Sequence, residues 1–275
     1  MLVFETLQTI SLNGTPGRAN DDRVGATQRL AWVIDGATDL GPPGLLGPQG
    51  GAAWLADTAS LGFARSEKPS LAATCAEVFA FVAVRYAADR TRDVQAAWER
   101  PKAAFAAVQL VAERLHIAWA ADCAVLLLSR GGGVWGSAPP DSAAEAADAQ
   151  ALGPGVGADP VLSAEALADR RAHRSRRDHI ALSPDANASA ASTCHADVPV
   201  SPGDAVMLMS DGFSALLSEY GRYRAETFMD ALQQKGLEGL AAETRAIERA
   251  DAACLRYPRF KVSDDLTAIW LRVAG

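Results

Sequence analysis

The segment Val206-Met207-Leu208-Met209-Ser210-Asp211-Gly212 runs from an apolar stretch directly into an acidic residue and a glycine. Consecutive apolar residues are typical of a strand inside a core, so a carboxylate at its end would be held rigidly at the core's edge. Other apolar runs carry acidic residues at their ends or starts: Asp21, Asp22, Asp35, Asp122, Asp264 and Asp265. Several such ends brought together would form an all-oxygen site suited to Mg²⁺ or Mn²⁺, which would favour hydrolysis by metal-bound water.

Length and composition indicate a single globular domain over residues 1–275. With 49% hydrophobic residues the chain can bury a substantial core. Length alone would also allow two domains, but no clean linker divides the sequence. The formal net charge of −7 argues against a nucleic-acid partner. Composition by itself explains the excess of acid as simple solubility, although bound cations would explain it equally well.

The cysteines and the N-terminal segment indicate a reducing compartment. Cys75, Cys123, Cys194 and Cys254 are scattered without a CxxC pair, as expected for buried reduced thiols. Residues 1–12 lack the basic and long apolar regions of a signal peptide, and no uncharged apolar run reaches about 18 residues. We therefore expect a soluble, cytoplasmic monomer without membrane contact.

The periodicity of apolar residues predicts strands mixed with helices. Ser70 is a plausible N-cap for a helix that is apolar over more than one face and should be well covered. Short strands joined by short turns between 105 and 135 indicate an antiparallel meander. Strands are expected at 2–10 on a sheet edge, then at 29–34, 105–111, 115–119, 124–129, 134–135, 206–209 and 266–273; helices are expected around 54–61, 71–86, 163–179, 213–218 and 237–247.

The middle of the chain, about 137–200, is expected to form a mobile loop or flap region. Ser137 to Pro160 is rich in Ala, Pro, Gly and Asp and is interpreted as a mobile surface loop over the site. The helix expected from Ser163 to His179 is strongly basic. Its arginines would either attract an acidic or phosphorylated partner or form a solvated charged face, and the second interpretation is favoured; they are Arg170, Arg171, Arg174, Arg176 and Arg177.

Taken in order, the acidic motifs resemble those of the metal-dependent protein phosphatases (PPM, type 2C), particularly compact bacterial members. A single Asp-Gly pair would be weak evidence, because such pairs make turns and acidic residues cap helices. The resemblance depends on the ordered set, which covers nearly the whole chain: Arg18-Ala19-Asn20-Asp21-Asp22-Arg23, Trp32-Val33-Ile34-Asp35-Gly36, Ala121-Asp122-Cys123, Pro202-Gly203-Asp204 leading to Met209-Ser210-Asp211-Gly212-Phe213, and Ser263-Asp264-Asp265-Leu266-Thr267.

The resemblance implies an α+β fold, an α-β-β-α sandwich of two antiparallel sheets flanked by helices, with a binuclear metal centre at one end. Asp35 would bridge both metals and the Gly36 carbonyl would bind the first. Asp21, Asp211 and Asp264 would bind the second metal. Asp22 would hold metal-bound waters, and Asp122 with Asp211 would bind a third ion. The cofactors implied are two or three Mg²⁺ or Mn²⁺ ions, and Asp22, Asp35 and Asp211 are the implied catalytic residues.

Some residues depart from the family pattern. Asp21 stands where the family usually has Glu, and Arg18 lies one residue closer to the acidic pair than the usual phosphate-binding arginine. Either Arg18 or Arg23, or neither, would therefore bind the substrate phosphate. Ala37 and Thr38 follow Gly36 where many relatives carry a histidine that serves as general acid, so protonation of the leaving group would fall to water.

The resulting hypothesis is a Mg²⁺- or Mn²⁺-dependent phosphatase that hydrolyses phosphoserine or phosphothreonine in proteins by attack of a water or hydroxide bridging two metals. Such metal pairs lower the pKa of water and neutralise phosphoryl oxygens. No Ser/His/Asp or Cys/His motif offers a protein nucleophile. Two alternatives remain: a catalytically weak or inactive protein of the same fold that binds a phosphoprotein, and a regulatory module that docks a partner through the basic helix.

Overall fold

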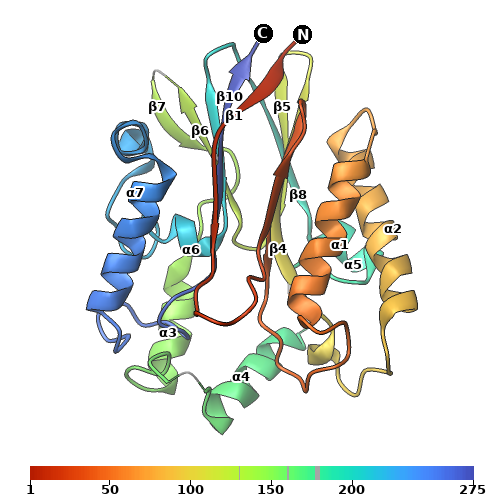
Figure 1. Cartoon of the computed structure of the whole chain (residues 1–275), viewed down its shortest axis with the longest axis vertical. Coiled ribbons are helices and arrows are strands. Elements are labelled where there is room, and N and C mark those ends of the chain that lie inside the picture. Colours follow the sequence, from red (N-terminus) through yellow and green to blue (C-terminus); the bar gives the residue numbers. More distant parts are fainter. Residues whose placement is uncertain (130, 160, 177–179) are drawn as a thin grey trace.

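Two five-stranded antiparallel sheets lie face to face in a computed structural model, which describes residues 1–129, 131–159, 161–176 and 180–275 (Figure 1). Sheet A has the order β1 (Val3–Leu12), β10 (Leu266–Ala274), β9 (Ala205–Met209), β6 (Ala124–Ser129) and β7 (Gly132–Trp135). Sheet B has the order β2 (Arg23–Ala26), β3 (Leu30–Gly36), β4 (Ala103–Val111), β5 (Arg114–Ala120) and β8 (Cys194–Pro199).

The main core lies between the sheets, where alternate side chains of each strand meet. Val33 of β3 and Val206 and Leu208 of β9 are fully buried in this layer. Trp32 and Ile34, on the other face of β3, pack instead against the helices outside sheet B. Because β3 is covered on both faces, its sequence is continuously apolar rather than alternating.

Helices cover the outer face of each sheet, which confirms the predicted α-β-β-α sandwich (Figure 1). Helices α1 (Gly51–Arg65) and α2 (Leu71–Asp89) cover sheet B, whereas α6 (Asp211–Ser214) and α7 (Phe228–Ala250) cover sheet A. Helix α7 is interrupted at Gly236, where φ is 64°. Two short 3₁₀ helices, Ala97–Glu99 and Ala225–Thr227, complete this part of the fold.

Helix α2 begins as predicted but is less covered than predicted. The hydroxyl of Ser70 accepts a hydrogen bond from the Ala73 amide at 3.4 Å, which is the expected N-cap. Val78 and Val82 are buried, yet Val84 is 68% exposed because only one face of α2 meets α1 and sheet B. Among the described residues, α2 is also the one helix whose length and apolar composition would suffice to cross a membrane, a test that core helices of other folds can also pass.

The predicted meander is wrong in its connectivity. Strands β4 and β5 form a hairpin in sheet B, whereas β6 and β7 form one in sheet A. The chain crosses between the sheets at residues 121–123, where Ala121 takes the left-handed conformation with a φ of 61°. Local hairpin signals predicted the strands correctly but contained no information about which sheet each hairpin joins.

The segment predicted as a loop from Ser137 to Pro160 contains a helix. Helix α3 (Ser142–Leu152) begins after Asp141, whose carboxylate accepts a hydrogen bond from the Ala143 amide at 3.0 Å. Alanine is the strongest helix former, so this composition suits a helix better than a loop. Pro160 lies outside the described residues.

Helix α4 (Ala164–Arg174) confirms the predicted basic helix, with Ser163 as its N-cap. Arg177 and His179, predicted at its end, lie outside the described residues. Helix α5 (Ala186–Ser192) and strands β2 and β8 were not predicted. The remaining strands agree with the predicted ones to within a few residues, including β1 at the edge of sheet A.

The four cysteines form no disulfide. Cys75, Cys123 and Cys254 are buried as expected, but Cys194 is exposed because it begins the edge strand β8.

Candidate metal centre

The predicted ligands come from strand ends of both sheets. Asp35 lies near the end of β3 in sheet B, whereas Asp211 follows β9 and Asp264 precedes β10 in neighbouring strands of sheet A. Asp122 lies where the chain crosses between the sheets, two residues before Ala124, which pairs with Met209. These four side chains line one cavity of about 1320 Å³ at this end of the sandwich.

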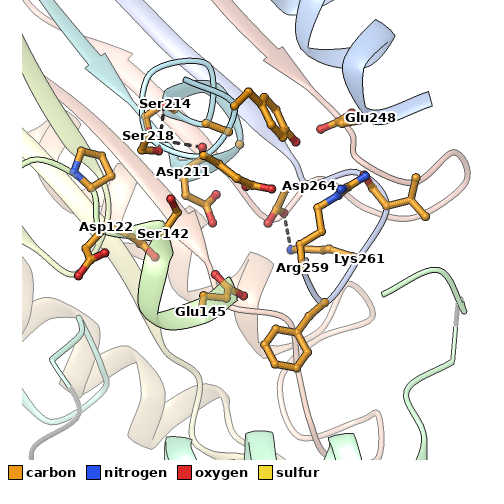
Figure 2. A pocket seen from close by; sticks show the side chains of 18 residues that line it. Asp122, Ser142, Glu145, Asp211, Ser214, Ser218, Glu248, Arg259, Lys261 and Asp264 are labelled. Atoms are coloured by element: carbon orange, nitrogen blue, oxygen red, sulfur yellow. Dashed lines mark hydrogen bonds and ion pairs between the residues drawn. The ribbon is translucent and has the colours of Figure 1, made fainter. Parts of the chain in front are cut away.

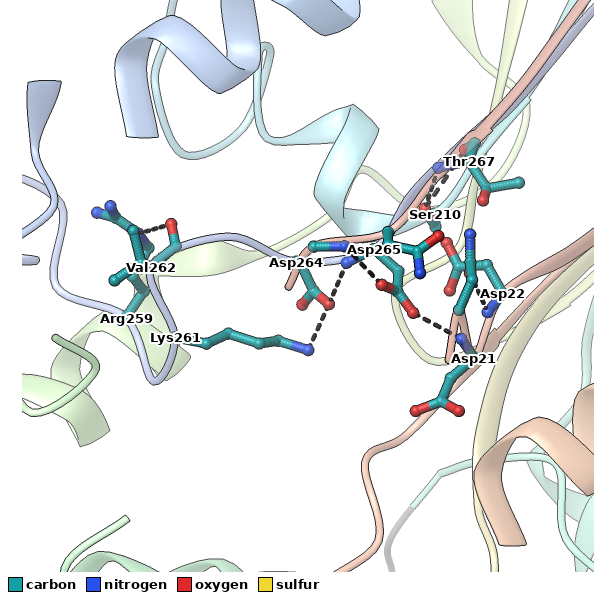
Figure 3. A network of polar contacts seen from close by, with 12 residues as sticks. Asp21, Asp22, Ser210, Arg259, Lys261, Val262, Asp264, Asp265 and Thr267 are labelled. Carbon is teal, nitrogen blue, oxygen red and sulfur yellow. Dashed lines mark hydrogen bonds and ion pairs between the residues drawn. The ribbon is translucent and has the colours of Figure 1, made fainter. Parts of the chain in front are cut away.

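The ends of β9 and β10 are fixed by hydrogen bonds between backbone and side chain. The Ser210 amide donates to the Thr267 carbonyl at 2.9 Å, and the Thr267 amide donates to the Ser210 hydroxyl at 3.0 Å (Figure 3). Gly212 allows the next close approach, because a β-carbon there would lie 2.1 Å from the Asp265 carbonyl oxygen. The strand ends therefore hold Asp211 and Asp264 beside each other.

Asp21 and Asp22 reach the site through the loop before β2. The Asp21 amide donates to Asp265 Oδ2 at 2.6 Å, and the Asp21 carbonyl accepts from the Gly36 amide at 3.2 Å. Asp22 is only 2% exposed, and neither oxygen of its carboxylate has a hydrogen-bond partner among the described residues. The loop thus links the two sheets and places a buried charge between them.

Burial and mutual repulsion raise the pKa of the aspartates in this cluster. Burial, followed by the charges of Asp22 and Asp211, raises the pKa of Asp35 well above its ordinary value. Burial, followed by Asp264, raises the pKa of Asp22 to about 7 and that of Asp211 well above 3.8. Each ionised carboxylate is therefore costly next to the others, and a cation among them would offset that cost.

The donor set fits divalent cations. Carboxylate and carbonyl oxygens are the ligands that Mg²⁺ and Mn²⁺ prefer, and buried oxygens of Asp22 and Asp211 lack partners within the part of the chain that the structure describes. No three Asp, Glu, His or Cys side chains of these described ranges form a ready-made ligand set for one ion. Binding of a divalent cation would therefore draw the carboxylates closer together, because the cation offsets their mutual repulsion.

The two predicted phosphate-binding arginines lie in different surroundings. Arg18 is exposed and lines the large cavity. Arg23 pairs with Asp57, and its Nη1 donates to the backbone carbonyls of Asn20 at 2.7 Å and Asp22 at 2.6 Å. The guanidinium of Arg23 therefore stabilises the loop that carries Asp21 and Asp22.

Three residues near the site escaped the sequence analysis. Lys261 forms an ion pair with Asp264, and Glu145 of α3 lines the same pockets as Asp122 and Asp211 (Figure 2). Asp39 accepts a hydrogen bond from the Gly51 amide at the start of α1. No sequence signal singled out these residues, because none of them belongs to one of the ordered acidic motifs.

The basic helix α4 faces inward more than the sequence indicated. Arg174 is 8% exposed and donates to the Thr38 carbonyl at 2.8 Å. Arg171 donates to the Leu40 carbonyl at 2.7 and 2.9 Å. Because both arginines hold the loop after Asp35 and Gly36, neither interpretation of the helix, as a docking surface or as a solvated face, describes them.

Comparison with solved structures identifies the fold. The catalytic domain of the serine/threonine protein phosphatase PstP in complex with two manganese ions is 18% identical, with a TM-score of 0.59 and full coverage of both chains. The Mycobacterium tuberculosis phosphatase PstP/Ppp is 17% identical, with a TM-score of 0.59, over 100% of this chain and 99% of that one.

PppA of Pseudomonas aeruginosa, described as a key regulatory component of its T6SS, is 17% identical over 99% of this chain and 100% of its own, with a TM-score of 0.58. At this level of identity the likeness establishes the fold alone. No family model and no curated protein matches the sequence.

Proposed function

We propose that this chain, which has the fold of the PPM phosphatase catalytic domain, is a metal-dependent phosphatase of phosphoserine and phosphothreonine in proteins. The observation that carries the proposal is a pair of features: Asp35, Asp211 and Asp264 line one cavity, and Asp22, a buried carboxylate without a hydrogen-bond partner in the described structure, is close enough for its charge to raise the pKa of Asp35. Asp22 itself is not among the residues that line the cavity. An uncompensated buried charge destabilises the fold, and a bound cation would compensate it.

The proposed ligands are carboxylates from the strand ends and from the loop before β2, together with the Gly36 carbonyl. Asp35 and the Gly36 carbonyl would hold the first ion, Asp21, Asp35, Asp211 and Asp264 would hold the second, and Asp122 with Asp211 would hold a third. When bound, these ions supply an activated water as nucleophile and neutralise charge on the phosphoryl oxygens.

The chain's own residues would bind the substrate phosphate, and they offer neither a thiolate nucleophile nor a general acid. Arg18, at the cavity wall, would bind the phosphate of the incoming side chain. Burial, followed by the charge of Asp35, raises the pKa of the Cys123 thiol well above its ordinary value, so this thiol stays protonated and is a poor nucleophile. Since Ala37 and Thr38 have no acidic proton to give near Gly36, the leaving group would take its proton from water.

Metal-dependent turnover tests this function. Hydrolysis of an aryl phosphate and of a phosphothreonine peptide should require Mn²⁺ or Mg²⁺, and equal rates in chelator and in metal would rule it out. Asp35→Ala and Asp211→Ala should each lose about 100-fold or more in activity, because each removes a direct ligand. Asp197→Ala, which removes an exposed carboxylate paired with Arg114, is the control and should retain activity.

A binding measurement with the same phosphothreonine peptide, made beside the turnover assay, separates the inactive alternative. A protein that binds the phosphothreonine peptide in Mn²⁺ without releasing phosphate would be a phosphoprotein-binding module of the same fold.

A further inference from the structure

The ammonium of Lys261 lies inside the candidate metal centre although it belongs to no motif. It pairs with Asp264 (Figures 2 and 3). It also lines the cavity together with Asp211 and Asp35. Among the described residues, it is the one basic side chain that forms an ion pair with a proposed metal ligand. About half of its side chain, 48%, remains exposed to the solvent of the cavity.

The loop that carries Lys261 is held by a buried arginine. Arg259 is 8% exposed and pairs with Asp251 at 2.7 Å. The same guanidinium donates to the Val262 carbonyl at 3.2 Å (Figure 3). It also donates to the Tyr257 carbonyl at 2.7 Å, on the other side of the lysine in the sequence. Lys261 is therefore presented by a fixed backbone rather than by a free surface loop.

The arginines of helix α4, which line the cavity as well, have partners of their own. Arg170 of α4 lies over the ring of Phe260, with its guanidinium carbon 4.2 Å from the ring centre. Arg171 and Arg174 donate to carbonyls of the loop after Gly36. These three arginines thus contribute to packing, whereas Lys261 forms an ion pair with a proposed metal ligand.

Resting on the proposed function, we propose that Lys261 binds the phosphate of the substrate beside the metal ligands, in addition to Arg18 at the cavity wall. An ammonium has three N–H donors, and the bond to Asp264 leaves two for phosphoryl oxygens. The ion pair fixes their direction, and the positive charge offsets the repulsion that a phosphate dianion meets among carboxylates. The ligand class is a phosphate dianion, supplied by a phosphoprotein or by free inorganic phosphate.

The test compares Lys261→Met with Lys68→Met in the Mn²⁺-loaded protein. Lys68 is a matched control, because its side chain is 46% exposed and it pairs with Glu77 on the surface. Lys261→Met should raise KM for a phosphothreonine peptide and the inhibition constant of inorganic phosphate in parallel, each about tenfold or more, as expected for one charge-assisted hydrogen bond. Lys261→Arg should restore most of the affinity, and Lys68→Met should match the wild type.

Calorimetry supplies a readout that does not depend on turnover. Titration of inorganic phosphate into the Mn²⁺-loaded proteins should give a weaker dissociation constant for Lys261→Met, with Mn²⁺ affinity within about threefold of the wild type. Unchanged phosphate affinity with tighter Mn²⁺ binding would overturn the proposal, since Lys261 would then be only a counter-ion of Asp264. Lost Mn²⁺ binding would overturn it as well, because the role would be structural.

The two proposals fail separately. If the wild type shows no metal-dependent turnover, the phosphatase function fails, and the phosphate titration still decides the role of Lys261: equal phosphate affinity in wild type and Lys261→Met contradicts it.

Discussion

A single carboxylate, that of Asp265, joins the first loop of the chain to its last strand at the cavity. Its two oxygens accept hydrogen bonds from the Gly14 amide at 2.7 Å and the Asp21 amide at 2.6 Å. Gly14 packs so closely that a β-carbon there would lie 2.4 Å from the Asp264 carbonyl carbon. Asp265 therefore organises the site through the backbone, while Asp264 beside it is the proposed ligand.

Asp22→Asn should separate the electrostatic cost of the site from its metal binding. The amide keeps the size of the side chain but removes a buried charge, so the melting temperature in chelator should rise. Mn²⁺ affinity, measured by calorimetry, should fall about 10- to 100-fold. Asp197→Asn should change neither quantity, and an Asp22→Asn protein with wild-type Mn²⁺ affinity would contradict a role for Asp22 in the metal centre.

At the scale of the elements, helix α4 is joined by hydrogen bonds to the loop that follows Asp35 and Gly36. Arg174→Met should loosen this connection, because the Thr38 carbonyl loses its buried donor at a cost of about 1–3 kcal/mol. Amide hydrogen exchange over 164–174 should accelerate while exchange in the strands stays slow. Arg65→Met, at the exposed end of α1, is the control; equal protection of α4 in both variants would count against the connection.

The strands that flank the motifs were predictable because burial on both faces makes them continuously apolar, as in β3 and β9. Strand β2 was missed because its four residues include Gly25 and it forms only against β3. Strand β8 was missed because its edge position leaves most of its side chains exposed or half-buried. These elements depend on pairing with distant residues, which periodicity within one segment does not report.

The acidic side chains of the site were predictable because ordered motifs carry them. Lys261 and Arg174 were not assigned their contacts, since a lysine in a polar loop and an arginine in a basic helix look like surface residues. Arg174 depends on a partner that is far away in the sequence, because it contacts Thr38 across 136 positions. For Lys261 the difficulty is the opposite, because its partner Asp264 is three residues away and only the fold reveals the cavity.

At the scale of the whole molecule, stability in chelator should depend on pH in a direction set by the acidic cluster. Burial, followed by nearby carboxylates, raises the pKa of Asp21 and of Asp22 from 3.8 to about 7. Each group binds its proton more strongly in the folded than in the unfolded state, so the free energy of unfolding should fall as the pH rises from about 4 to about 7. Asp251 and Glu243, whose paired carboxylates have a pKa of about 2, act below this window.

Mn²⁺ should reverse this trend, because it binds the ionised carboxylates of the folded state only. Melting temperatures at about pH 5 and about pH 7, each with Mn²⁺ and with chelator, should show the larger metal-induced increase at the higher pH. An equal increase at both values, or none, would contradict a close acidic cluster.

The pairing of Val3 with Ala274 brings both termini to one end of the sandwich, and helices α3 and α4 lie at the opposite end (Figure 1). A fluorescent label, an affinity tag or a solid support attached at either terminus would therefore stand far from the mouth of the cavity. Under the proposed function, bulky phosphorylated proteins would keep free access, so the immobilised protein should hydrolyse them as readily as it does in solution.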